Sequence, residues 1–438
     1  MSCELPDGEE DSILPETRSR VKDLLDSGTC IKCKSAKGII SVHYAIFCGD
    51  CLKESATKRF KSTIRQQPLQ HLPNGRVLVA YSGGISSSLM MYLMSALLSG
   101  NMYKTSRFTG LVVCHIDESA IAGTGSTQQE DVWKCILDAR HVVEYVVKSL
   151  EDIFTNDAAP MSSSPRDRLL ESLASASKQS SREDLIQCYQ RQLLMQVARE
   201  YECPYIALGD TSTRLAIKVI SSVSKGRGLG VPDLVNSEVT MTGCDGSQVV
   251  VIKPMKEFSS KEIAMLVNLY KIPIPTIARY DTGLPAKSSI DRLTEDFVLS
   301  LLKDFPSTTS TVLKTALKVQ TGHRTNPGVS MCALCGGPVD PSSRRWRQFH
   351  TVSITPPNYS KCSSSTESCC RAPFTELALA SLVCYGCANV IKESDVDKLP
   401  PFVKHNVGAM QKQIVGRERD ERLKSQISEF LIEDADDS

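Results

Sequence analysis

A valine-rich apolar run followed at once by a Ser-Gly-Gly turn places the strongest constraint on how this chain folds. Residues 76–81 read RVLVAY and residues 82–88 read SGGISSS. The short apolar run predicts a buried parallel strand, and the pattern from 85 to 98 predicts a helix with one apolar side. Glycines allow a tight turn, and the free N–H groups at a helix start attract anions. The segment therefore predicts a phosphate-binding turn between a strand and a helix.

The turn resembles the pyrophosphate-binding PP-loop of adenylating ATP pyrophosphatases, which reads Ser-Gly-Gly-X-Asp-Ser. Ser82, Gly83, Gly84 and Ser87 match this pattern, and Ser86 stands where that family has aspartate. A serine hydroxyl is neutral and is a much weaker ligand for Mg²⁺ than a carboxylate. The change argues against magnesium-assisted adenylation and leaves open whether ATP still binds.

Strand-like and helix-like segments alternate from residue 72 to residue 290. Strand-like runs occur at 109–116, 141–147, 205–209 and 249–252, with helical patterns at 184–202, 210–223 and 260–270. This alternation predicts an α/β fold with a doubly wound parallel sheet, in which ligands bind beyond the carboxyl ends of the strands. Within this PP-loop-like domain, residues 156–182 are rich in serine, alanine and proline and are expected to form a flexible loop.

The rest of the chain divides into smaller segments and carries no sign of a membrane anchor. We expect an acidic tail at 1–27, a helical connector at 291–330 and a charged helical tail at 396–438. The formal charge is +1, so no overall field indicates nucleic acid. There is no run of 18 apolar residues and no secretory signal at the N-terminus. These features predict a cytoplasmic protein.

Eight of the 17 cysteines form four C-x-x-C pairs. The first two pairs are 14 residues apart and predict a zinc ribbon at 28–56, while the other two are 48 residues apart and predict a second four-cysteine module at 331–395 with an inserted loop. The alternative for the second set is two pairs that never meet. Closed four-sulfur sites contribute folding energy, and two zinc ions are expected. The predicted ligands are Cys30, Cys33, Cys48 and Cys51, and then Cys332, Cys335, Cys384 and Cys387.

Clusters of basic residues are candidates for contacts with nucleic-acid phosphates. One lies on the predicted helix after the first cysteine module, another in a glycine-rich stretch, and a third surrounds Trp346, which could stack on a base. The alternative for each residue is a solvated surface charge. The candidates are Lys58, Arg59, Lys61 and Arg65, then Lys225 and Arg227, then Arg344, Arg345 and Arg347.

The order of these features over residues 28–395 resembles the second subunit of the eukaryotic cytoplasmic tRNA 2-thiolation complex. The match includes both cysteine modules, the altered turn, and the strings ALGDT at 207–211, KGRG at 225–228 and IKPM at 252–255. The resemblance implies a complex that places sulfur on the wobble uridine of the lysine, glutamate and glutamine tRNAs. It implies that the sulfur comes from a thiocarboxylated ubiquitin-related modifier, and that a catalytic paralogue adenylates the uridine and forms a heterodimer with this chain.

Residues that the resemblance assigns to catalysis are replaced. Catalytic relatives carry Gly-His-Asn-X-Asp-Asp after the fourth strand, where this chain has GDTSTR at 209–214. They also carry a C-x-x-C pair before an Arg-Gln pair, where this chain has Glu183 and Ile186 before Arg191 and Gln192. Sulfur transfer requires a thiolate or a cluster held by thiolates. We therefore expect a non-catalytic subunit that acts as heterodimer partner and tRNA-binding scaffold.

Two other hypotheses remain open. One is an autonomous ATP-dependent thiolase or adenylating enzyme, in which Cys188 or Cys203 acts as the nucleophile and the turn binds phosphate. The other is an adaptor built on the zinc modules that makes no contact with nucleic acid.

Overall fold

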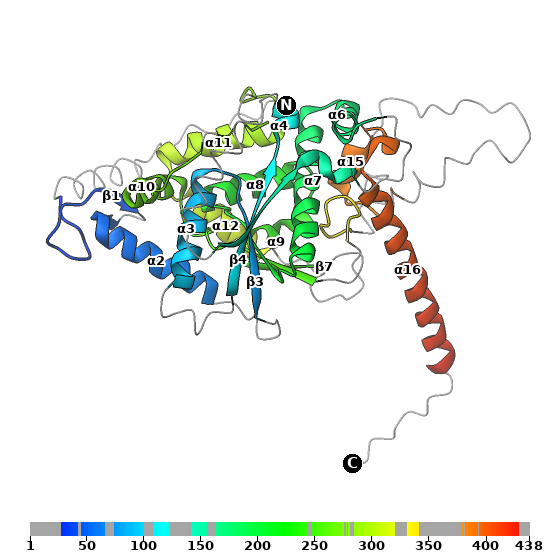
Figure 1. The fold of residues 1–438 in the computed structure, drawn as a ribbon, viewed down its shortest axis with the longest axis horizontal. Helices are drawn as coiled ribbons and strands as arrows, with labels where there is room; N and C mark the ends of the chain where they lie inside the picture. The colour runs from blue at the N-terminus through cyan, green and yellow to red at the C-terminus, as the bar shows by residue number, and fades with distance from the viewer. Residues whose placement is uncertain are drawn as a thin grey trace, which may run out of the picture.

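A computed structural model describes most of the chain, drawn in colour in Figure 1. The described residues are 28–42, 45–65, 74–99, 108–122, 142–155, 163–242, 248–319 except 276, 278 and 281–283, then 331–340 and 379–428 except 380, 381 and 393. The predicted acidic tail at 1–27 and the basic group at 344–347 lie outside them. Within the described part, no helix is both long and apolar enough to cross a membrane.

A six-stranded sheet runs through the centre of the main domain (Figure 1). Its order is β5-β4-β3-β6-β8-β7, and the first five strands are parallel. The strands are β3 (Gly75–Ala80), β4 (Phe108–Asp117), β5 (Val142–Ser149), β6 (Tyr205–Ala207), β7 (Glu238–Thr242) and β8 (Gln248–Ile252). This confirms the predicted parallel sheet, to which the structure adds the antiparallel edge strand β7.

The direction in which strands are added reverses between β3 and β6. From β3 the chain proceeds outward through β4 to β5, then returns to the other side of β3 with β6 and β8. In such sheets, ligands bind at the carboxyl ends of the two strands on either side of the reversal. The Ser-Gly-Gly turn follows β3 at this point, so the fold positions the turn where a ligand crevice is expected.

Helices cover both faces of the sheet because the strand side chains alternate between two apolar clusters. Val77 and Val79 of β3 join the core formed with α3 (Ile85–Ser99) and α10 (Ser260–Tyr270). Leu78 points to the opposite face, in a cluster that includes residues of α7 (Gln179–Glu200). These three strand residues have no exposed surface, and each such burial stabilises the fold by roughly 1.5–3 kcal/mol.

The loop expected at 156–182 is partly wrong, because residues 165–175 form helix α6 (Pro165–Ser175). Ser164 caps this helix by accepting a hydrogen bond from Asp167 N, and Pro165 occupies the first helical position. Both features favour a helix start. Leu169 and Leu173 then bury against α7 and its neighbours. The composition suggested a loop, but the capping residues and two buried leucines outweigh it.

Smaller elements flank the sheet. Before it lie the hairpin β1 (Ile40–Val42) and β2 (Ala45–Phe47) and helix α2 (Gly49–Arg65). The predicted connector contains α11 (Ile290–Asp304) and α12 (Thr308–Lys318), and the predicted C-terminal helix is α16 (Pro401–Ser428), which extends away from the body in Figure 1. The others are α4 (Ser119–Ala122), η2 (Leu150–Phe154), α8 (Ser212–Ser224), η3 (Gly228–Gly230), α9 (Val231–Val235), α15 (Tyr385–Lys392) and η5 (Val396–Lys398).

Candidate phosphate turn and metal centres

The serine side chains of the predicted phosphate turn form hydrogen bonds with other groups of the protein. Ser87 Oγ donates a hydrogen bond to the Gly84 carbonyl at 2.9 Å and lies 3.3 Å from Ser82 Oγ. Ser86 Oγ donates to the carbonyl of Gly209 at 2.5 Å, across the reversal point of the sheet. The residue that replaces the PP-loop aspartate therefore joins the turn after β3 to the segment after β6.

An apolar side chain packs against the glycine of the turn. Gly83 has a φ of +73°, a conformation that favours glycine. A Cβ at this position would collide with Ile277 Cδ1 and would lie 3.4 Å from Pro275 Cγ. Ile277 thus occupies the space beside Gly83, so glycine is needed here for packing as well as for the turn.

The positions at which the resemblance predicts catalytic residues make structural contacts. Asp210 accepts hydrogen bonds from Lys218 Nζ at 2.6 and 2.8 Å. Burial alone would raise the pKa of Asp210, but Lys218 and Lys253 together hold it below the usual value. Glu183 accepts a hydrogen bond from Ser289 Oγ at 2.8 Å, and burial raises the pKa of this carboxyl. Ser289 is the N-cap of α11, so Glu183 fixes the start of that helix.

The cysteines proposed as alternative nucleophiles are buried. Cys188 lies in the apolar cluster beneath the C-terminal module, and Cys203 lies in the cluster behind the sheet. Burial raises the pKa of Cys203 to about 11, which disfavours the nucleophilic thiolate at neutral pH. Neither thiol has the solvent exposure of a catalytic cysteine.

The four N-terminal cysteines converge at the base of the β1–β2 hairpin. The Sγ atoms of Cys30, Cys33, Cys48 and Cys51 all lie within 4.8 Å of one another. The first pair forms a tight knuckle, in which Lys34 N donates to Cys30 O at 2.8 Å and Lys34 adopts a φ of +56°. Cys33 is exposed, so this cluster reaches the protein surface.

The four C-terminal cysteines also converge, although 48 residues separate their two pairs. Their Sγ atoms lie within 4.8 Å of one another, with Cys335 and Cys384 at 3.7 Å. Gly337 N donates to Cys335 Sγ at 3.4 Å within the first knuckle. Ala333 N donates to Leu382 O at 2.9 Å, and this hydrogen bond ties the two knuckles together. The alternative of two pairs that never meet is therefore excluded.

Both clusters have the donor set and spacing for one metal ion each. A tetrahedral ion with metal–sulfur bonds of about 2.3 Å requires sulfurs about 3.8 Å apart. One sulfur pair in each cluster shows this spacing, with 3.9 Å between Cys33 and Cys48 and 3.7 Å between Cys335 and Cys384. Each site can therefore hold a metal ion with four thiolates, and all ligand positions are filled by the protein.

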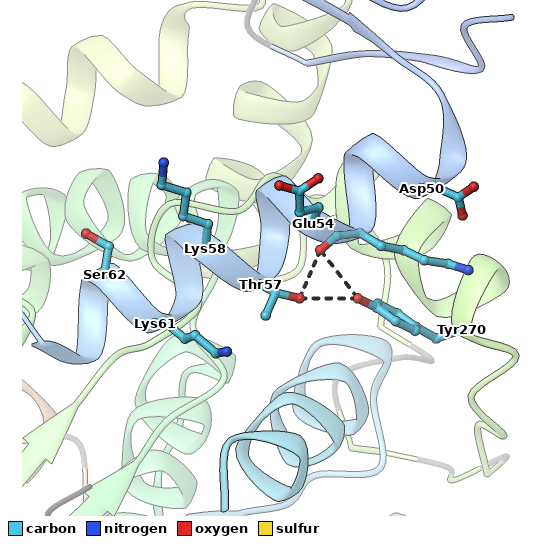
Figure 2. A pocket seen from close by; sticks show the side chains of 8 residues that line it. Asp50, Glu54, Thr57, Lys58, Lys61, Ser62 and Tyr270 are labelled. Carbon is cyan, nitrogen blue, oxygen red and sulfur yellow. Dashed lines mark hydrogen bonds between the residues drawn. The ribbon is translucent and has the colours of Figure 1, made fainter. Parts of the chain in front are cut away.

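Two of the basic candidates on α2 border a surface depression with a volume of about 840 Å³. Its lining includes Lys53, Lys58, Lys61 and Tyr270, and Figure 2 shows Thr57 and Tyr270 pointing toward one another. Their hydroxyls are 3.4 Å apart. Lys58 is exposed and Lys61 is half-buried, so both can contribute positive charge to this surface.

The other basic candidates lie elsewhere. Arg59 forms an ion pair with the buried Glu262, and its guanidinium lies 4.6 Å from the centre of the Phe258 ring. Lys225 and Arg227 form ion pairs with buried Asp184, at 2.9 and 2.8 Å. Arg65 ends α2, and its side chain lies outside the described part. The partners of Arg59, Lys225 and Arg227 are distant in sequence, which is why the clusters of basic residues gave no sign of them.

The fold and its sites define an α/β protein with an altered phosphate turn at the sheet reversal and two four-cysteine centres. The family model described as cytoplasmic tRNA 2-thiolation protein 2 matches residues 289–389. Curated proteins of that name are 26% identical to this chain in Danio rerio, over 93% of this chain and 95% of theirs, and 26% identical in Homo sapiens, over 93% and 94%. The resemblance to this family is therefore confirmed.

A solved structure with partial similarity is the U34-tRNA thiolase NcsA from Methanococcus maripaludis with its [4Fe-4S] cluster. Its sequence identity is 16% and its TM-score is 0.47, and the match covers 66% of this chain and 86% of that chain. At this TM-score the likeness does not assign a function.

Proposed function

We propose that this chain is the non-catalytic subunit of the cytoplasmic complex that 2-thiolates the wobble uridine of the lysine, glutamate and glutamine tRNAs. It pairs with a catalytic thiolase paralogue and supplies part of the tRNA-binding surface. The sulfur reaches the paralogue from a thiocarboxylated ubiquitin-related modifier. The names of the relatives support the process and its cytoplasmic location.

One observation carries the non-catalytic role: positions that match catalytic residues in the relatives are engaged in contacts within the fold. Ser86 bonds to Gly209, Asp210 pairs with Lys218, and Glu183 holds the N-cap of α11. These contacts leave neither a free carboxylate for a metal nor a free thiolate for sulfur at those positions. The same sheet and turn can still present a surface to a partner and to RNA.

Zinc is the metal that we propose for both four-cysteine centres. Zn²⁺ prefers four tetrahedral ligands in structural sites, and thiolates are among its commonest ligands. Such closed sites have no open position for a substrate, so the zinc would stabilise the two modules and take no direct part in catalysis.

The proposed heterodimer is supported by exposed apolar side chains on α11. Leu293 and Phe297 are 51% and 52% exposed, and they lie one turn apart on the same side of the helix. Exposed apolar groups in a row are typical of protein interfaces. On this proposal the paralogue covers this side of α11.

The test compares the purified chain alone, the paralogue alone and the two mixed, in assays of ATP–pyrophosphate exchange and tRNA thiolation. We expect no exchange and no thiolation by the chain alone, and more thiolation by the mixture than by the paralogue. Exchange catalysed by the chain alone would support the autonomous enzyme instead. An unchanged tRNA affinity on adding the chain to its paralogue would support the adaptor hypothesis.

The tRNA surface is testable at the lysines of α2. The double variant Lys58→Glu, Lys61→Glu should weaken tRNA binding by the heterodimer. The slope of log affinity against log salt concentration should also fall in magnitude by about 1–2, because two phosphate contacts are lost. Lys404→Glu, at an exposed position of α16 and away from α11, is the matched control. Filter binding between low and high salt measures both quantities, and an unchanged slope in the double variant would remove these lysines from the interface.

A further inference from the structure

The glycine-rich loop at 225–228 packs closely against the second knuckle of the C-terminal cysteine centre, which is the turn formed by residues 384–387. Gly226 has a φ of +75°, and a Cβ at this position would collide with the ring of Tyr385, the residue after Cys384. In return, a Cβ on Gly386 would lie 2.7 Å from Arg227 Cγ. Each segment therefore carries a glycine where the other approaches, and this allows their backbones to come close together.

This approach places the guanidinium of Arg227 against a sulfur ligand. Arg227 Nη2 lies 3.6 Å from Cys387 Sγ and 2.8 Å from Asp184 Oδ2. Cys387 has no exposed surface, and Asp184 is 5% exposed. Lys225 binds the other oxygen of Asp184 at 2.9 Å and reaches Asp291 of α11 at 2.6 Å. The loop is thus fixed on three sides, by α7, by α11 and by the cysteine knuckle.

A second guanidinium lies on the first knuckle of the same centre. Arg191 of α7 donates a hydrogen bond to Gly336 O at 3.3 Å, and Gly336 directly follows Cys335. Gly336 has a φ of +61°, and a Cβ there would lie 2.7 Å from Arg191 Nη2. A glycine again permits an arginine to approach the cysteine centre.

Charge explains why two arginines would be needed here. A divalent ion with four thiolates carries a net charge of −2, and a buried charge is costly unless opposite charges lie close to it. Cys332, Cys384 and Cys387 are buried, so water screens this centre little. The N-terminal centre differs, because Cys33 is exposed and the neighbouring Lys32 is paired with Glu54 at the surface.

We propose that Arg227, with Arg191, balances the charge of the C-terminal metal–thiolate centre, and that the 225–228 loop is the element that holds this centre on the α/β domain. Lys225 and Arg227 then serve the metal site in place of the tRNA contacts suggested by their sequence. Arg227 acts as a positioning residue, because it contacts a ligand sulfur and not the metal. The inference rests on the proposed metal occupancy.

The experiment measures metal retention at each centre of the full-length chain separately. The metal content is first determined by elemental analysis. The chain is then exposed to a chelator, and the alkylation rate of each cysteine is followed by mass spectrometry. Arg227→Gln should speed alkylation of Cys384 and Cys387 by about tenfold or more, as expected for loss of an outer-shell partner, while Cys48 and Cys51 keep the wild-type rate. The alkylation rate in Arg227→Lys should lie between those of the wild type and of Arg227→Gln, since lysine keeps the charge but lacks the planar guanidinium.

Substitutions at two glycines, one as the test and one as its control, provide a second experiment that leaves every charge in place. Gly386→Ala would displace Arg227 by contact with its Cγ and should give the same selective acceleration, even if Arg227→Gln fails to fold. Gly228→Ala is the matched control, because a Cβ there meets no atom within 4 Å. Wild-type rates in both Arg227→Gln and Gly386→Ala, or equal acceleration at both centres, would overturn the inference. A chain purified without metal would overturn the proposed zinc sites as well.

Discussion

Replacing Cys387 with serine should release one metal ion and unfold the C-terminal module while the sheet domain stays folded. Cys387 is the most buried ligand of its centre, and it lies in one apolar cluster with Leu185 and Tyr189 of α7 and with Phe402 of α16. Structural zinc sites contribute about 10–16 kcal/mol of binding energy in small peptides. Even a fraction of that energy exceeds the folding free energy that a module of this small size can supply by itself.

The measurement combines elemental analysis with hydrogen exchange. The variant should hold one metal ion per chain in place of two, and exchange should rise in α15 and in the start of α16. Cys203→Ser is the matched control, because Cys203 is also buried but belongs to neither of the two four-cysteine groups found among the described residues. Two retained ions and unchanged exchange in the Cys387 variant would contradict the four-thiolate site.

Replacing Arg59 with methionine should destabilise the chain by about 3–5 kcal/mol, because the change leaves a buried carboxylate without its cation. The Glu262 side chain is 1% exposed, and Arg59 is the cation that pairs with it. Arg59 also packs over Phe258 and so connects α2 to α10. This role differs from the predicted phosphate contact, and the loss should appear in the absence of any RNA.

Denaturant unfolding measures the effect, with Lys58→Met as the matched control. Lys58 precedes Arg59 on the same helix and is exposed, so its loss should change the free energy of unfolding by no more than about 0.5 kcal/mol. The double variant Arg59→Met, Glu262→Met should recover much of the lost stability, since no charge is then left buried. If Arg59→Met were as mild as Lys58→Met, Arg59 would remain available for tRNA.

The sheet could be predicted from sequence because its strands are buried on both faces and therefore read as continuous apolar runs. The predicted strand at 109–116 differs from β4 (Phe108–Asp117) by one residue at each end. Strand β7 (Glu238–Thr242) was missed because the string EVTMT is short and polar at every second position. It is an edge strand with one neighbour, so the sequence had little apolar signal to give.

The site could be predicted only where a ligand set has its own spacing in the sequence. The cysteine pairs have such spacing, and their convergence is found in the structure. The carboxylates that bind Lys225, Arg227 and Arg59 have none, because they lie 41, 43 and 203 residues away from these basic residues. A lysine or arginine bound to a distant carboxylate has the same local sequence as one that faces solvent. Burial decides between the two, and burial is a property of the folded chain.

The hydrogen bond from Ser86 to Gly209 limits which residues can replace this serine. An aspartate at position 86 would point its acceptor oxygens at the carbonyl oxygen of Gly209, and two acceptors without a proton between them repel each other. A single substitution to aspartate would therefore not give a carboxylate free to bind a metal ion, because the segment after β6 would have to move as well. Serine fits at this position because its hydroxyl donates a hydrogen bond to a carbonyl oxygen, which an ionised carboxylate cannot do.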